Sequence, residues 1–165
     1  MRIVALLLFT ISVLAHAQEK GISNPQLQNI PYELSRAFYA QELNRVYKFS
    51  FHINPFYLRG DFDGDGKPDF AAFITKKDSP DKDIVIFNSG SQHIFVIGEG
   101  TDSSPEHFNR IDNWQVIPVG SPAQPNIEVI RKLHEECIHM GVFEDGGGVL
   151  YWNGKEYIWQ TSPRD

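Results

Sequence analysis

The sequence predicts an α+β domain in which an N-terminal helix packs on a mostly antiparallel sheet of about eight strands. Residues 31–47 have the apolar spacing of a helix. From residue 47 onward, short apolar or alternating segments of strand length are separated by turn residues. Asn153-Gly154 lies between two such segments and indicates a hairpin. Because consecutive strands joined by short turns pair with their neighbours, we expect the helix to cover one face of an antiparallel sheet.

The first 17 residues are predicted to be a signal peptide. Arg2 precedes an apolar run from Ile3 to Ala15, and Ala15-His16-Ala17 is a small-x-small cleavage site. The run has about 13 apolar residues, whereas a membrane-spanning helix needs about 20. We therefore expect an exported protein of the periplasm or extracellular medium, without a membrane span once the signal is removed. An uncleaved N-terminal anchor is the alternative.

Composition excludes several classes of partner. The chain has 165 residues, 41% of them hydrophobic, and a formal net charge of −6. An acidic protein lacks the basic footprint that nucleic acids or anionic membranes require, but it suits divalent cations. Its single cysteine, Cys137, cannot form an internal disulfide. An exported chain of this kind must take its stability from its core or from a bound metal.

The elements follow in order along the mature chain. Residues 18–30 are polar without periodicity and are predicted to be a flexible lead-in to a single domain, residues 31–165. Pro31 suits the first helical position, and Glu33 lies favourably in the first helical turn. The apolar stripe of the predicted helix contains Leu34, Ala37, Phe38, Leu43 and Val46.

Strands are predicted over the rest of the chain. Residues 47–53 alternate apolar and polar side chains, which is typical of a half-buried strand. Residues 70–75 form a continuous apolar run, as in a central strand, and Pro118 restricts the segment 114–119 to an edge or a strand end. Asn153-Gly154 predicts a type I′ turn. The other strand-like segments are 84–87, 93–97, 127–133, 138–143, 149–152 and 156–160.

The most informative stretch is "RGDFDGDGKPDF", which places four aspartates within nine residues. Ca²⁺ takes six to eight oxygen ligands, and alternating carboxylates with one backbone carbonyl can wrap around it. Gly66 stands at the sixth position of the loop, where the chain must turn sharply. Without a cation the carboxylates would repel one another. Positions 1, 3, 5, 7 and 9 of this loop are Asp61, Asp63, Asp65, Lys67 and Asp69.

The loop is not an EF-hand. Its first six positions match D-x-[DN]-x-[DN]-G, but Ala72 occupies position 12, where an EF-hand has a bidentate Glu. The D-x-D-G-D-G-x-x-D pattern between strands resembles the calcium loops of FG-GAP and VCBS-type repeats. That resemblance covers about residues 58–75 in one copy. It implies side-chain ligands from Asp61, Asp63, Asp65 and Asp69, and a carbonyl ligand from Lys67.

A wider resemblance covers most of the mature chain. The helix, "LRGDFDGDGKPD", a later Trp-containing strand and the terminal "YWNGKEYIW" resemble small exported bacterial proteins of unknown function. We therefore expect an exported, non-enzymatic Ca²⁺-binding domain whose metal is structural. It would act as an interaction or inhibitor-like module with a protein or glycan partner.

Other readings of the sequence remain open. An envelope hydrolase would place its site outside the calcium loop, with carboxylates such as Glu135, Glu136, Glu144 and Asp145 as candidates. A glycan- or protein-binding module would use exposed aromatic residues from Trp114, Tyr151, Trp152 and Trp159. His134, Cys137 and His139 are candidate zinc ligands, although their spacing does not match H-E-x-x-H. The Arg59-Gly60-Asp61 tripeptide does not indicate adhesion, because Asp61 is already a predicted calcium ligand.

Overall fold

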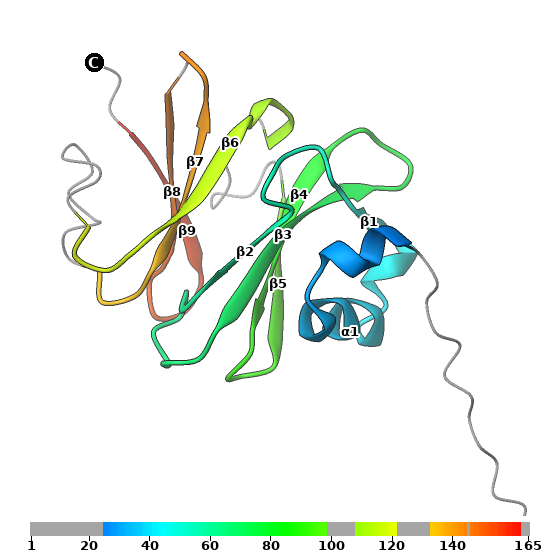
Figure 1. The fold of residues 1–165 in the computed structure, drawn as a ribbon, viewed down its shortest axis with the longest axis horizontal. Coiled ribbons are helices and arrows are strands. Elements are labelled where there is room, and N and C mark those ends of the chain that lie inside the picture. The colour runs from blue at the N-terminus through cyan, green and yellow to red at the C-terminus, as the bar shows by residue number, and fades with distance from the viewer. Residues whose placement is uncertain (1–24, 99–107, 122–132, 145, 163–165) are drawn as a thin grey trace, which may run out of the picture.

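The protein folds into two antiparallel sheets and a helix (Figure 1). A computed structural model describes residues 25–98, 108–121, 133–144 and 146–162. These residues contain nine strands and one α-helix. The predicted antiparallel pairing is confirmed and the α+β class agrees with the structure, but the strands form two sheets instead of one. The described helix is too short and too polar to cross a membrane. The predicted signal peptide lies outside the described residues.

The N-terminal region contains one helix flanked by two short 3₁₀ turns. The predicted helix of residues 31–47 ends early, because Glu42 adopts a left-handed backbone conformation with φ of 58°. Part of the predicted flexible lead-in is ordered and packs on the domain, since Ile30 is buried. The three elements are η1 (Pro25–Asn29), α1 (Tyr32–Ala40) and η2 (Leu43–Arg45).

The first sheet is built around β3, which is buried on both faces. This burial explains why the segment is a continuous apolar run. β4 pairs along one side of β3, while β1 and β2 share its other side, opposite residues 74–76 and 69–72. The strands are β1 (Tyr47–Phe49), β2 (Tyr57–Gly60), β3 (Asp69–Lys76), β4 (Lys82–Asn88) and β5 (His93–Ile97).

The second sheet is a sequential meander in the order β6-β7-β8-β9. The predicted strand at residues 127–133 lies almost entirely outside the described residues. The hairpin at Asn153-Gly154 is present, but Trp152 pairs with Tyr157, so its loop has four residues and not the two of a type I′ turn. The strands are β6 (Asn113–Ile117), β7 (Cys137–Val142), β8 (Gly146–Trp152) and β9 (Tyr157–Thr161).

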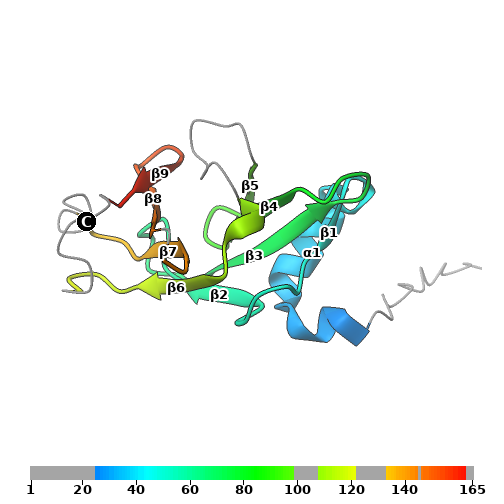
Figure 2. The same ribbon diagram turned by 90° about the horizontal axis from the view of Figure 1, so that it is seen from above.

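The elements stack in three layers, with the first sheet between the helix and the second sheet (Figure 1). Alternate residues of β3 serve the two interfaces: Phe70 and Ile74 pack with the helix, whereas Phe73 packs with the second sheet. The short turn η3 (Phe108–Arg110) adds Phe108 to the core between the sheets. At one edge the sheets meet, and β2 lies beside β6 (Figure 2). The acidic loop leaves β2 at this edge.

Candidate metal centre

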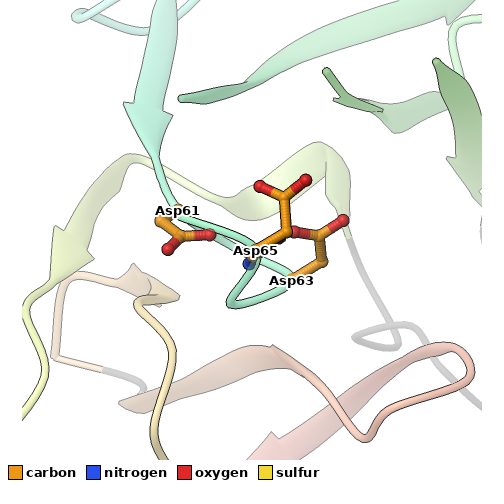
Figure 3. A group of neighbouring side chains, drawn as sticks. All are labelled: Asp61, Asp63 and Asp65. Atoms are coloured by element: carbon orange, nitrogen blue, oxygen red, sulfur yellow. Dashed lines mark hydrogen bonds between the residues drawn. The ribbon is translucent and has the colours of Figure 1, made fainter. Parts of the chain in front are cut away.

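Three of the predicted ligands converge in the loop between β2 and β3. One carboxylate oxygen from each of Asp61, Asp63 and Asp65 lies within 4.8 Å of the other two (Figure 3). We call these three side chains the acidic cluster. Oxygen atoms at this spacing can hold a metal ion. The alternating aspartates of the sequence therefore form a common site.

Local hydrogen bonds give the loop its shape. Each carboxylate of the acidic cluster accepts a backbone N–H from a residue two or five positions later, as Asp side chains do in turns. Gly64 and Gly66 have φ of 77° and 82°, a region that side chains disfavour, so the sharp turn expected at Gly66 is confirmed, although a Cβ there would meet no described atom within 4 Å. The bonds are Gly66 N–H to Asp61 (2.9 Å), Asp65 N–H to Asp63 (3.2 Å) and Lys67 N–H to Asp65 (2.8 Å).

One oxygen of the acidic cluster is left without a hydrogen bond. Asp61 Oδ1 is inaccessible to solvent and has no partner among the described residues, while Asp61 Oδ2 accepts the Gly66 N–H. A buried carboxylate oxygen without a donor costs free energy, since it has lost its hydration. Asp61 thus has an oxygen that no described donor occupies, and such a donor set fits a metal.

Asp69 has a different environment from the acidic cluster. Its side chain is fully buried, and its oxygens accept backbone N–H groups from Phe62 (3.0 Å), Asp63 (3.3 Å) and Ser89 (2.8 Å). Burial raises the pKa of Asp69 to about 6, although these N–H groups oppose the shift. Asp69 is not one of the three converging side chains. As the first residue of β3, it connects the start of the loop, at Phe62 and Asp63, with the turn that contains Ser89. Its role as a metal ligand stays a prediction.

The turn between β4 and β5 supports the acidic cluster from the first sheet. Asn88 donates its Nδ2–H to Asp63 Oδ2 at 2.8 Å. Gly90 lies against Asp65, where any Cβ would overlap the carboxylate. Burial, as the largest effect, raises the pKa of Asp63 above its ordinary value. The sequence "NSGS" predicts only a turn here and does not reveal these contacts.

The second sheet supports the acidic cluster from the other side. Asp61 donates its N–H to Glu136 Oε2 at 2.8 Å, and Glu136 donates its N–H to the Asp61 carbonyl at 3.0 Å. The buried Tyr157 hydroxyl donates to Asn88 Oδ1 at 2.6 Å. Sequence reasoning missed the roles of Asn88, Glu136 and Tyr157, because no spacing pattern links positions so far apart in the chain.

Lys67 contributes a weak ion pair within the loop. Its Nζ lies 3.8 Å from Asp65 Oδ2, and the side chain is exposed. Such a pair is worth little in solvent and would yield to a divalent ion. The predicted metal contact is the Lys67 carbonyl, and that contact stays a prediction.

An open cavity of about 550 Å³ adjoins the acidic cluster. The residues that line it include Asp63, His134, Glu135, Tyr151 and Trp152. The four aromatic residues expected to form a platform are not all available to a ligand. Trp114 is buried between the sheets and donates its Nε1–H to the Pro55 carbonyl at 2.7 Å.

The other candidate residues do not assemble into comparable sites in the described part of the chain. His134, Cys137 and His139 do not form a group with metal-ligand spacing there. Burial raises the pKa of the Cys137 thiol to about 12, and the charges of Glu135 and Glu136 add to the shift. A cysteine binds zinc as the thiolate, so this environment disfavours metal binding at Cys137. Asp145 lies outside the described residues.

Ser50 and His52 form a serine–histidine pair outside the acidic cluster. Ser50 Oγ lies 2.9 Å from His52 Nδ1. Burial, with the charge of Lys82, lowers the pKa of His52 to about 4. The imidazole ring packs edge-on against buried Phe73, with ring centroids 4.8 Å apart. This exposed histidine therefore contacts the inter-sheet core through Phe73.

Comparison of the chain with protein-family models, curated proteins and solved structures found no match. The resemblance to FG-GAP and VCBS-type loops therefore rests on the motif itself. The chemistry of the site rests on the geometry of its own residues.

Proposed function

We propose that the chain is an exported, non-enzymatic Ca²⁺-binding module in which the ion orders the loop between β2 and β3. The observation that carries the proposal is the convergence of Asp61, Asp63 and Asp65, with one inaccessible carboxylate oxygen left unpaired. A divalent ion offsets the repulsion among three carboxylates and supplies that oxygen with a partner. The metal would then contribute stability that an internal disulfide cannot supply in a chain with one cysteine.

The donor set favours calcium over other divalent ions. Carboxylate and carbonyl oxygens suit hard cations, and Ca²⁺ accepts irregular coordination by six to eight of them. Mg²⁺ demands near-octahedral geometry and retains several waters, so a loop of converging carboxylates suits it less. The motif's likeness to FG-GAP and VCBS-type loops supports the same ion. Without a bidentate Glu at position 12, the Kd is expected at about 10⁻⁴–10⁻³ M.

Thermal unfolding in Ca²⁺ and in chelator tests this function. At 10 mM Ca²⁺ the expected stabilisation is about 1.4–2.7 kcal/mol, which corresponds to a rise in Tm of roughly 3–10 °C. The double variant Asp63→Ala/Asp65→Ala should lose the rise. Glu33→Ala/Asp78→Ala is the matched control, since it removes two exposed carboxylates outside the acidic cluster. An unchanged Tm for the natural protein across millimolar Ca²⁺ would rule out a structural calcium.

The cavity beside Asp63 favours a second candidate, a binding module for a glycan or protein segment. Its walls combine the half-buried rings of Tyr151 and Trp152 with polar side chains, a mixture that small-ligand sites use. A glycan array probed in Ca²⁺ and in chelator tests it. Retained fluorescence on defined oligosaccharides, reduced by Trp152→Ala, is the expected result. An array without bound protein would exclude glycans as the ligand.

A further inference from the structure

The acidic cluster lies in the loop between β2 and β3 of the first sheet, but two residues from the C-terminal part of the chain support it: Glu136 bonds to Asp61, and Tyr157 of β9 bonds to Asn88, which in turn bonds to Asp63. We infer that Tyr157 and Glu136 are positioning residues of the metal centre, so that ion binding and docking of the two sheets are thermodynamically coupled. This inference rests on the proposed function, since it concerns the same site. It adds that the second sheet, and not the loop alone, sets the affinity.

Tyr157 acts through Asn88 on Asp63. The tyrosine hydroxyl donates to Asn88 Oδ1 at 2.6 Å, and Asn88 Nδ2–H donates to Asp63 Oδ2 at 2.8 Å. Tyr157 is 3% exposed and Asn88 is 1% exposed, so the bond between them is shielded from water, whereas the bond to Asp63 is partly buried. The Asp63 carboxylate only accepts, so it takes the donating end of the Asn88 amide, and the accepting end then receives the Tyr157 hydroxyl, which holds the amide in place. The orientation of this cluster carboxylate therefore depends on a residue of β9.

Glu136 acts on the backbone of Asp61. This glutamate directly precedes β7 and exchanges two hydrogen bonds with Asp61, one through its carboxylate at 2.8 Å and one through its N–H at 3.0 Å. Gly60 permits the approach, because a Cβ there would lie 2.7 Å from Glu136 Oε2. The pair fixes the direction in which the first aspartate of the loop leaves β2.

The contacts of Glu136 and Tyr157 act on two members of the same acidic cluster, Asp61 directly and Asp63 through Asn88. If the second sheet moves away from the first, Asp61 loses its backbone partner, and Asp63 loses the anchor of its amide donor. Carboxylates that are already oriented lose less conformational freedom when an ion binds. Binding linkage is reciprocal, so an ion that prefers the docked arrangement also stabilises docking.

Calorimetric titration of Tyr157→Phe with Ca²⁺ tests the inference. The variant removes one hydroxyl, changes no charge and leaves Asp61, Asp63 and Asp65 in place. One hydrogen bond is worth about 1 kcal/mol, so the Kd should rise about fivefold. Tyr47→Phe is the matched control, because Tyr47 bonds to the buried carboxylate of Asp83 elsewhere in the first sheet. It should lower stability in chelator without changing the Kd.

Glu136 provides a second, independent variant should Tyr157→Phe fail to fold. Glu136→Gln retains an oxygen that accepts the Asp61 N–H, whereas Glu136→Ala does not. If positioning is the cause, Glu136→Ala should weaken Ca²⁺ binding severalfold more than Glu136→Gln. If the two substitutions weaken Ca²⁺ binding equally, Glu136 contributes only its negative charge and is not a positioning residue.

Hydrogen exchange of the natural protein provides a readout without any substitution. Ca²⁺ should slow exchange at amides of β7 and β9 as well as in the loop. If the natural protein binds no Ca²⁺, the proposed function and the inference both fail. If it binds Ca²⁺ but protection is confined to the loop, and Tyr157→Phe has the natural affinity, only the inference fails.

Discussion

Substitution of Gly90 should weaken ion binding at the acidic cluster without disturbing the rest of the fold. In the turn between β4 and β5, the three atoms nearest to a Cβ on Gly90 all belong to the Asp65 carboxylate. Gly90 is not among the glycines with positive φ, so its backbone accepts alanine. Gly90→Ala should therefore leave the fold intact and turn Asp65 away from the acidic cluster. Asp65 is exposed and can make this movement at little cost.

Gly90→Ala should not destabilise the protein in chelator, but it should destabilise the protein in the presence of calcium. In chelator, Gly90→Ala should be neutral or stabilising by about 0.4–1 kcal/mol, since alanine restricts the unfolded chain. Loss of a positioned ligand should weaken Ca²⁺ binding about 10–100-fold. For a natural Kd of about 10⁻⁴ M, the stabilisation by 10 mM Ca²⁺ would then fall from about 2.7 to about 0.4–1.4 kcal/mol.

Urea unfolding in chelator and in 10 mM Ca²⁺, combined with calorimetric titration, measures both effects. Ser91→Ala in the same turn is the control, because within the described part of the chain its hydroxyl has a long 3.5 Å contact with the Asn88 carbonyl and no other hydrogen bond. It should behave like the natural protein in both conditions. Natural Ca²⁺ affinity in Gly90→Ala would refute the assignment of Asp65 to the metal centre.

Three further predictions follow from the packing around the site and the core. Gly60→Ala should lower stability by about 1–3 kcal/mol even in chelator, because its Cβ would lie 2.6 Å from the Phe62 ring and 2.7 Å from Glu136. Urea unfolding measures this loss, and a variant as stable as the natural protein would contradict the tight packing. His52 has a folded pKa of about 4, below the unfolded value near 6.5, so its own contribution to stability should fall as pH falls through this window, whereas Asp69, with its pKa raised to about 6, contributes in the opposite direction. His52→Gln should remove the histidine contribution, so that in chelator the variant loses less stability than the natural protein as pH falls, and an identical pH dependence would refute the assignment. Cys137 is 2% exposed, and its pKa is raised to about 12. A thiol reagent at pH 8 should therefore react slowly with the native protein and fast with the protein in denaturant, and equal rates would contradict this burial.

Local patterns in the sequence predict the parts of the fold whose causes are local. The continuous apolar run at residues 70–75 indicates a central strand, and β3 is buried on both faces. The aspartate spacing likewise predicts the convergence of Asp61, Asp63 and Asp65, because turn hydrogen bonds within the loop bring them together. These features depend on residues close to one another along the chain.

The features that sequence analysis missed depend on contacts between distant segments. β2 is only four residues long and forms because it pairs with β3, so its own composition gives a weak indication. Strand-like segments do not reveal which sheet they join. In the folded chain, Phe73 of the first sheet and Ile138 of the second are buried in one core between the sheets. Glu136 reaches the acidic cluster, and Tyr157 reaches Asn88 beside it, only because the two sheets stack.

The role of Asp69 illustrates the same limit. Its position in the motif predicts a metal ligand, but spacing does not specify which neighbours compete for its oxygens. In the folded chain, backbone N–H groups of the loop and of Ser89 surround this carboxylate. A residue at a ligand position of the motif can therefore hold the loop to the scaffold.

A crystal structure grown in millimolar Ca²⁺ tests the central claim most directly. The account predicts one ion with oxygens of Asp61, Asp63 and Asp65 at about 2.3–2.6 Å, including the unpaired Asp61 Oδ1. It also predicts that Asn88 still bridges Asp63 and Tyr157. A well-ordered loop with no ion between these three carboxylates, at a Ca²⁺ concentration above 10 mM, would contradict the account.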